Sequence, residues 1–250
     1  MKLTDHCYAV LGLGYSPPWV VNAGFIIGAE KTLIIDSGPN YLSAQTIYGY
    51  SKNLNPHNEI LVINTEKHFD HIGGNSFFSE KEIKIYAHKN NIRTNNEFGE
   101  EKDYFNKIID NARRREAHEE DMFFQNTYVV KPDKDLTGND IFLLGRDEEA
   151  KIIFTPGHTA SNISVYFQSE KVLYCGDLIV NGYIPNLEAG NIEDWKLWIK
   201  SLEFVASLEI DFIVPGHGNI ILRNEVNKNI NRIISFLKEA ISENKPPTVK

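Results

Sequence analysis

Short apolar runs separated by polar turns recur along most of this chain, and they predict a protein that contains both strands and helices. The runs of strand length span residues 7–13, 20–27, 32–35, 60–63, 83–87, 151–155, 163–167, 171–175 and 210–214. The segments with apolar residues three or four apart, which predict helices, span residues 43–54, 194–208 and 224–243. Strands interspersed with helices in this way indicate an α/β protein.

The densest polar cluster follows the apolar run 60–63. Four side chains of metal-ligand type lie within six positions there, namely Glu66, His68, Asp70 and His71. If the segment were extended, Glu66, His68 and Asp70 would point to one side and His71 would lie just beyond them. So many imidazole and carboxylate groups are costly to bury unless something binds them, so the cluster predicts a divalent metal site.

Three later apolar runs end in a similar way, with a glycine next to a residue of metal-ligand type. These residues are His158, Asp177 and His217. The ends of several strands converge on one edge of the sheet in α/β proteins, and such edges carry the functional sites. We therefore expect all these side chains to meet in one centre.

At this point the sequence resembles the metallo-β-lactamase fold superfamily, which includes glyoxalase II-like thioesterases, lactonases and β-lactamases. The resemblance covers nearly the whole chain, from the segment 21–24 through 34–38 to 215–218, and its five motifs occur in family order. The resemblance implies a single domain over residues 1–250, folded as a four-layer αββα sandwich of two mixed β-sheets flanked by helices. It also implies that a helical insertion at about 90–125 lies near the active-site mouth.

The resemblance assigns a role to each residue of the cluster. The first metal would be bound by Glu66, His68 and His158, the second by Asp70, His71 and His217, and Asp177 would bridge the two. The same resemblance places Asp36 behind the ligands, where it would fix a metal-bound imidazole. A purely turn-forming role for Asp36 before Ser37-Gly38 is the alternative.

Glu66 departs from the family pattern, which has histidine at this position. Two divalent ions balanced by Asp70, Asp177 and a hydroxide would leave one positive charge, and Glu66 would cancel it. The favoured interpretation is that Glu66 binds the metal directly; it could also bind weakly and leave a mononuclear enzyme, or turn away and leave a degenerate binding protein. Zinc is the expected metal at both sites, and a carboxylate shifts the first site towards iron or manganese.

The implied function is a metal-dependent hydrolase. A bridging hydroxide of a binuclear site would attack an ester, thioester, lactone or β-lactam carbonyl, and Asp70 is the predicted catalytic residue that orients it. Two alternatives come from other classes: a non-haem di-iron protein that binds oxygen or nitric oxide, and a catalytically weak metal-binding protein.

The composition of the chain limits the kinds of binding partner that we expect. The chain has 250 residues, 42% of them hydrophobic, with a formal net charge of −8. This charge argues against binding nucleic acid through its phosphates, and no segment predicts a membrane span or a signal peptide. Two cysteines are too few for a disulfide framework. We expect a cytoplasmic protein with a small-molecule substrate, and a homodimer is an open alternative.

Several further residues carry weaker predictions. Tyr15 and Trp19 are candidates for the substrate wall, with simple aromatic packing equally favoured. The arginines at 113–115 are interpreted as a solvated helical face. His88 and Cys175 are expected to be structural, with Cys175 acting as a small buried hydrophobic residue.

Overall fold

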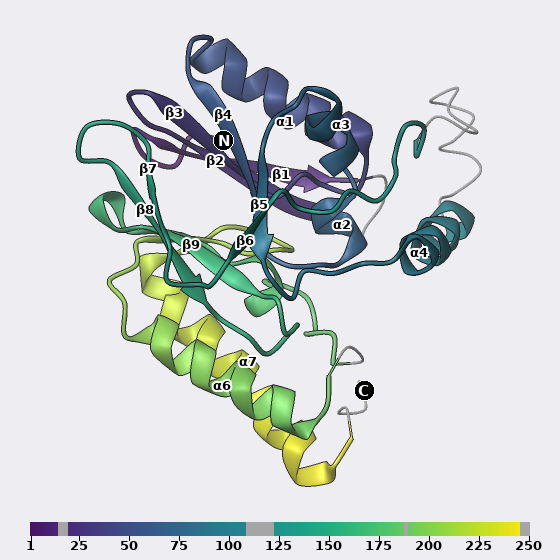
Figure 1. Ribbon diagram of the computed structural model, residues 1–250. Coiled ribbons are helices and arrows are strands. Elements are labelled where there is room, and N and C mark those ends of the chain that lie inside the picture. Colours follow the sequence, from purple (N-terminus) through teal and green to yellow (C-terminus); the bar gives the residue numbers. More distant parts are fainter. Residues whose placement is uncertain (15–19, 109–122, 188–189, 246–250) are drawn as a thin grey trace.

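Two six-stranded sheets pack face to face, and helices cover their outer faces, as Figure 1 shows. The computed structural model describes residues 1–14, 20–108, 123–187 and 190–245. The arrangement confirms the predicted four-layer αββα sandwich.

The first sheet has its strands in chain order. They are β1 (Cys7–Leu13), β2 (Val21–Ile27), β3 (Lys31–Ile35), β4 (Glu59–Asn64), β5 (Ile85–His88) and β6 (Lys134–Leu136). The strands β1 to β3 pair antiparallel, whereas β3 to β6 pair parallel. The sheet is therefore mixed, with its parallel part next to the helices that connect the strands.

The second sheet is also mixed. Its strands are β7 (Ile141–Leu143), β8 (Glu149–Phe154), β9 (Ile163–Phe167), β10 (Val172–Tyr174), β11 (Phe212–Val214) and β12 (Ile221–Leu222). All neighbours pair antiparallel except β10 and β11, which are parallel. Consequently β8, β10 and β11 all run in one direction and end at the same edge.

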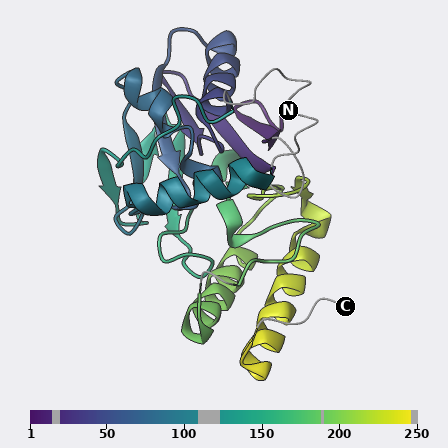
Figure 2. The same cartoon turned by 90° about the vertical axis from the view of Figure 1, so that its right-hand side faces the viewer.

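The burial of the strands explains their apolar runs. In β4, Leu61 and Ile63 belong to the core between the sheets, whereas Ile60 and Val62 belong to the core under the helices. Both faces of the strand are buried, so its run is continuous rather than alternating. The outer helices are α1 (Tyr41–Leu54) and α3 (Asn75–Glu80) on the first sheet, and α6 (Ile192–Ala206) and α7 (Arg223–Glu243) on the second. Figure 2 shows α6 and α7 side by side.

Helix boundaries follow their capping residues. Helix α1 begins two residues before the predicted start, because the Asn40 side chain accepts a hydrogen bond from the Ser43 amide. Helix α6 begins at a capping box formed by Asn191 and Asp194. Within the predicted insertion, α4 (Asn95–Ile108) is helical. The short strands β6, β7 and β12 were not predicted, since two or three residues give no periodic signal.

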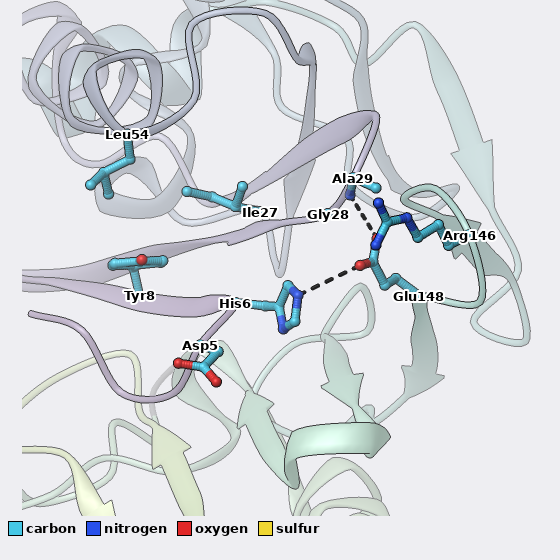
Figure 3. A pocket seen from close by; sticks show the side chains of 9 residues that line it. All are labelled: Asp5, His6, Tyr8, Ile27, Gly28, Ala29, Leu54, Arg146 and Glu148. Atoms are coloured by element: carbon cyan, nitrogen blue, oxygen red, sulfur yellow. Dashed lines mark hydrogen bonds and ion pairs between the residues drawn. The ribbon is translucent and has the colours of Figure 1, made fainter.

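The N-terminal segment makes ionic contacts at the other end of the sandwich, away from the edge where β8, β10 and β11 end. His6 lies 2.6 Å from the Glu170 carboxylate and 3.5 Å from that of Glu148. Glu148 also accepts a hydrogen bond from the Ala29 amide, and His6, Ala29 and Glu148 line a surface cavity of about 370 Å³ (Figure 3). Within the described ranges, no helix has both the length and the apolar character needed to cross a membrane.

Candidate metal centre

Four strand ends supply the side chains of the candidate centre. Glu66 lies two residues beyond β4, and His158, Asp177 and His217 follow β8, β10 and β11. The segment after β4 is joined to the start of β9 in the second sheet, because the Ile163 amide donates to the Thr65 carbonyl. Side chains far apart in the sequence therefore meet at one edge of the two sheets.

The segment that carries Asp70 and His71 is a helical turn, α2 (Phe69–Ile72), and not a continuation of the extended segment that alternation of the polar residues would favour. His68 is its N-terminal flanking residue. The turn can sit close to its neighbours only because Gly73 and Gly74 follow it. A Cβ at Gly73 would lie 2.1 Å from the Pro39 carbonyl oxygen, which no real side chain tolerates.

The first group of ligand atoms contains Glu66, His68 and His158. Glu66 Oε1 lies 2.8 Å from His68 Nδ1 and 3.5 Å from His158 Nε2, and the two imidazole nitrogens are 3.0 Å apart. The Glu66 side chain is completely buried. Glu66 thus points into the centre with the two histidines, so the turned-away conformation is not the one that the structure contains.

The second group contains Asp70, His71 and His217. His217 Nε2 lies 3.2 Å from Asp70 Oδ2. Asp177 stands between the groups: its Oδ2 is 3.3 Å from His217 Nε2 and 3.6 Å from His158 Nε2, and its Oδ1 is 3.3 Å from His71 Nε2. This position is the one that a bridging carboxylate needs.

Hydrogen-bond acceptors behind His71 and His217 set the tautomer of each imidazole ring. Asp36 Oδ2 lies 2.9 Å from His71 Nδ1, and Asp36 also accepts hydrogen bonds from the amide and hydroxyl of Thr65, both at 2.7 Å. His217 Nδ1 donates to the Val20 carbonyl at 2.8 Å. Because these acceptors hold the proton on Nδ1, each ring in its neutral form directs the lone pair of Nε2 at the centre.

The carboxylates and imidazoles of the centre stabilise one another's charged forms. Burial alone would raise the pKa of Glu66, but His68 and His158 outweigh it and hold that pKa well below the usual range. Burial is likewise outweighed at Asp177, whose pKa the nearby His217 holds well below normal. Burial would lower the pKa of His71, yet the adjacent carboxylates raise it well above its ordinary value.

The donor set fits divalent metal ions. Glu66 Oε2, His71 Nε2 and Asp177 Oδ1 are buried and have no hydrogen-bond partner among the described residues. Buried polar atoms normally have partners, and unpaired nitrogen and carboxylate oxygen atoms are what a metal ion binds. Mixed nitrogen and oxygen ligands suit zinc, iron and manganese.

Two supporting residues were not assigned a role from the sequence. The Asn22 side chain donates to the carbonyls of Pro215 and Gly218, at 2.9 and 2.8 Å, and so holds the loop of His217 from the other sheet. Gly216 approaches Asp177 so closely that a Cβ there would lie 1.9 Å from its Oδ1. The motifs 21–24 and 215–218 contained both residues, but nothing in the sequence paired them.

Other predicted residues have simpler places. His88 stacks on Phe154, with ring centroids 4.5 Å apart. Cys175 is buried with its thiol 3.6 Å from the carbonyl oxygens of Gly176 and Val214, as expected for a structural residue. Tyr15, Trp19, the arginines at 113–115 and the remainder of the insertion from 109 to 122 lie outside the described residues.

Comparison with known proteins identifies one family. The model of the metallo-beta-lactamase superfamily matches residues 16–217. The acyl-coenzyme A thioesterase MBLAC2 of Gallus gallus is 26% identical over 80% of this chain and 73% of its own length. The metallo-beta-lactamase IND-1 of Chryseobacterium indologenes is 23% identical over 87% of this chain and 80% of its own.

A solved structure has the same fold. It is a metallo-beta-lactamase family protein from Thermus thermophilus, which superposes with a TM-score of 0.72 at 18% identity. The superposition covers 97% of this chain and 82% of the other.

Proposed function

Because this chain belongs to the metallo-β-lactamase superfamily of metallo-hydrolases, we propose that it hydrolyses a carboxylic acid derivative, such as an ester or thioester, at a binuclear metal centre. The observation that carries the proposal is the pair of three-residue ligand groups with Asp177 between them. In this proposal Glu66, His68 and His158 hold one ion, while Asp70, His71 and His217 hold the other. Zinc is the proposed metal, and the Glu66 carboxylate increases the tolerance of its site for iron or manganese.

The substrate class that we propose is a thioester or ester, with lactones and β-lactams as further candidates. A thioesterase and a β-lactamase among the relatives support these classes, although each is similar to this chain at low identity. When bound, the ions would polarise the carbonyl and increase the acidity of a water molecule. Hydrolysis then joins the oxygen of that water to the carbonyl carbon, and the bond to the leaving group breaks as the leaving group takes a proton.

In this proposal, residues of the chain orient the metal ligands and accept a hydrogen bond from the attacking water. Asp70 is partly open to solvent, with 14% of its side chain exposed, so it can accept a hydrogen bond from the attacking water. Asp36 and the Val20 carbonyl keep His71 and His217 in the tautomers that direct Nε2 inwards. Burial raises the pKa of the Cys175 thiol, so Cys175 is poorly suited to act as a nucleophile.

The experiment that tests this proposal is a substrate screen with the metal-loaded protein. An acyl-coenzyme A thioester, a simple aryl ester, a lactone and a chromogenic β-lactam are each assayed with wild type and with Asp70→Asn. We expect at least one class to be hydrolysed, and Asp70→Asn to lower kcat by roughly 100-fold or more, as expected for loss of proton handling at the reacting water. Failure of all four classes with a fully loaded protein, or equal rates for the variant, would contradict the proposal.

A second function is favoured by one observation, the presence of three carboxylates, Glu66, Asp70 and Asp177, at the candidate centre. Oxygen ligands suit iron, and a di-iron centre would bind oxygen or nitric oxide rather than hydrolyse a carbonyl bond. A coloured protein that retains iron through purification and hydrolyses none of the four substrate classes would favour this function.

A further inference from the structure

The two ligand groups are held in place in different ways. In the second group, hydrogen-bond acceptors fix the rings of His71 and His217 from behind. In the first group, His158 Nδ1 is buried and has no hydrogen-bond partner in the described part of the chain. The position of the first group therefore depends on how the backbone segments that carry its ligands are held.

The loop that follows β5 holds the segment of Glu66. The Asn91 side chain donates to the Glu66 backbone carbonyl at 2.8 Å. Asn91 is buried, with 6% of its surface exposed, and its backbone amide donates to the His88 carbonyl at 2.7 Å. Because Glu66 lies two residues beyond β4, outside the paired part of the sheet, this side-chain hydrogen bond fixes the backbone of the ligand.

The same loop contacts the segment of His158. The His88 ring stacks on Phe154, the last residue of β8, with 15° between the ring planes. The Asn90 side chain donates to the Ala160 carbonyl at 3.2 Å. Phe154 precedes His158 by four residues and Ala160 follows it by two, so the loop contacts the chain on both sides of this ligand.

Helix α4, which follows the loop, contacts the segment of His68. Phe69 lies between His68 and Asp70 in the sequence and is only 1% exposed. Its ring centroid lies 4.7 Å from that of Phe98 and 5.4 Å from that of Phe105, and both of these residues belong to α4. One continuous stretch, residues 88–105, thus contacts the segments of all three ligands of the first group.

We propose that residues 88–105 form the positioning element of the first metal site, so that this site is complete only when α4 is docked on Phe69. The inference rests on the proposed binuclear centre and deepens it, because it states what controls the occupancy of one of the two sites. None of the described residues in this stretch belongs to a ligand group, so the stretch positions ligands and is not catalytic. Linked equilibria are reciprocal, so an ion bound at the first site stabilises the docked helix by the same factor.

The first test is a calorimetric titration of metal-free Asn91→Ala with Zn²⁺. We expect one of the two binding events to weaken about tenfold, the usual effect of residues that orient metal ligands, and the other to stay unchanged. Asn58→Ala is the matched control, because the buried Asn58 side chain also donates to a backbone carbonyl, that of Gly28 at 2.7 Å, beside the opposite end of β4. A purely structural role of the stretch predicts a lower Tm for both variants with both binding events unchanged.

The Glu66→Ala background identifies the affected site. Glu66→Ala removes a ligand of the first site, so adding Asn91→Ala should not weaken the remaining binding event further. Two unchanged binding events in Asn91→Ala, or equal weakening of both, would overturn the inference. The same loss in Asn58→Ala, or further weakening in the double variant, would also overturn it.

The second test measures hydrogen exchange of the α4 backbone amides with and without Zn²⁺. Wild type should exchange about tenfold more slowly with Zn²⁺, by the reciprocity of linked equilibria, and Glu66→Ala should show no such change. Equal exchange with and without Zn²⁺, or equal slowing in Glu66→Ala, would overturn the inference. Neither test reads hydrolysis, so a negative substrate screen alongside these expected results would contradict the proposed function and support the inference.

Discussion

Asp36 offers a sharp test of how the second ligand group is held in place. Its carboxylate accepts three hydrogen bonds, two from Thr65 and one from His71 Nδ1. Its backbone has a φ of +62°, a left-handed conformation that asparagine tolerates well. Asp36→Asn therefore preserves the backbone and the bond to the Thr65 amide, and it removes the carboxylate oxygen opposite the imidazole.

The asparagine amide would face His71 Nδ1 with hydrogen-bond donors. The ring would then favour the tautomer with its proton on Nε2, which removes the lone pair directed at the metal. A hydrogen bond to a charged partner contributes about 1.5–3 kcal/mol. We therefore expect the second metal to bind roughly 10- to 100-fold more weakly, in agreement with the usual effect of residues that orient ligands.

The assay is a calorimetric titration of the metal-free protein with Zn²⁺. Wild type should fill two tight sites, and Asp36→Asn should keep one tight site and show one weakened site. Asp133→Asn is the matched control, because Asp133 also accepts a backbone amide, that of Ile85, but lies away from the ligand groups. Two unchanged sites in Asp36→Asn, or equal weakening of both, would refute the proposed orientation of His71.

Three further predictions concern other parts of the molecule. Gly216→Ala should displace Asp177 and abolish the binding of at least one metal ion, measured by elemental analysis, because its Cβ would overlap the carboxylate. Burial would raise the pKa of Glu170, but hydrogen bonds from Thr4 and His6 hold that pKa below its normal value. The stability that this shift contributes is present above the unfolded pKa of about 4.3, and it is lost as the pH falls through the folded pKa. Glu170→Gln should therefore lower the Tm at pH 7, and the difference from wild type should shrink below about pH 4; a constant difference would contradict this. Removal of metal by a chelator should lower the wild-type Tm, and the Tm should return on addition of Zn²⁺.

Sequence reasoning reached the fold mainly through the order of the motifs, which resembled one family. The continuous apolar run of β4, which is buried on both faces, and the periodic segments of α1 and α7 agreed with that fold. It also reached the residues that meet at the candidate centre, since each follows a strand that ends at the same edge.

The rest depended on contacts that leave no local signal. The segment Phe69–Ile72 is a helical turn, although alternation of polar residues suggested an extended conformation. The close approach of Gly73 to Pro39 selects the turn, and that contact joins residues far apart in the sequence.

The most direct test of the central claim is the metal content per chain, measured by elemental analysis on wild type, Glu66→Ala and Glu66→His. We expect about two metal ions in wild type and in Glu66→His, and a loss of metal from the first site in Glu66→Ala, since Glu66 lies within ligand distance of His68 and His158. About one ion in wild type and two in Glu66→His would contradict this expectation. The protein would then be a mononuclear enzyme or a binding protein, and Glu66 would not be a ligand.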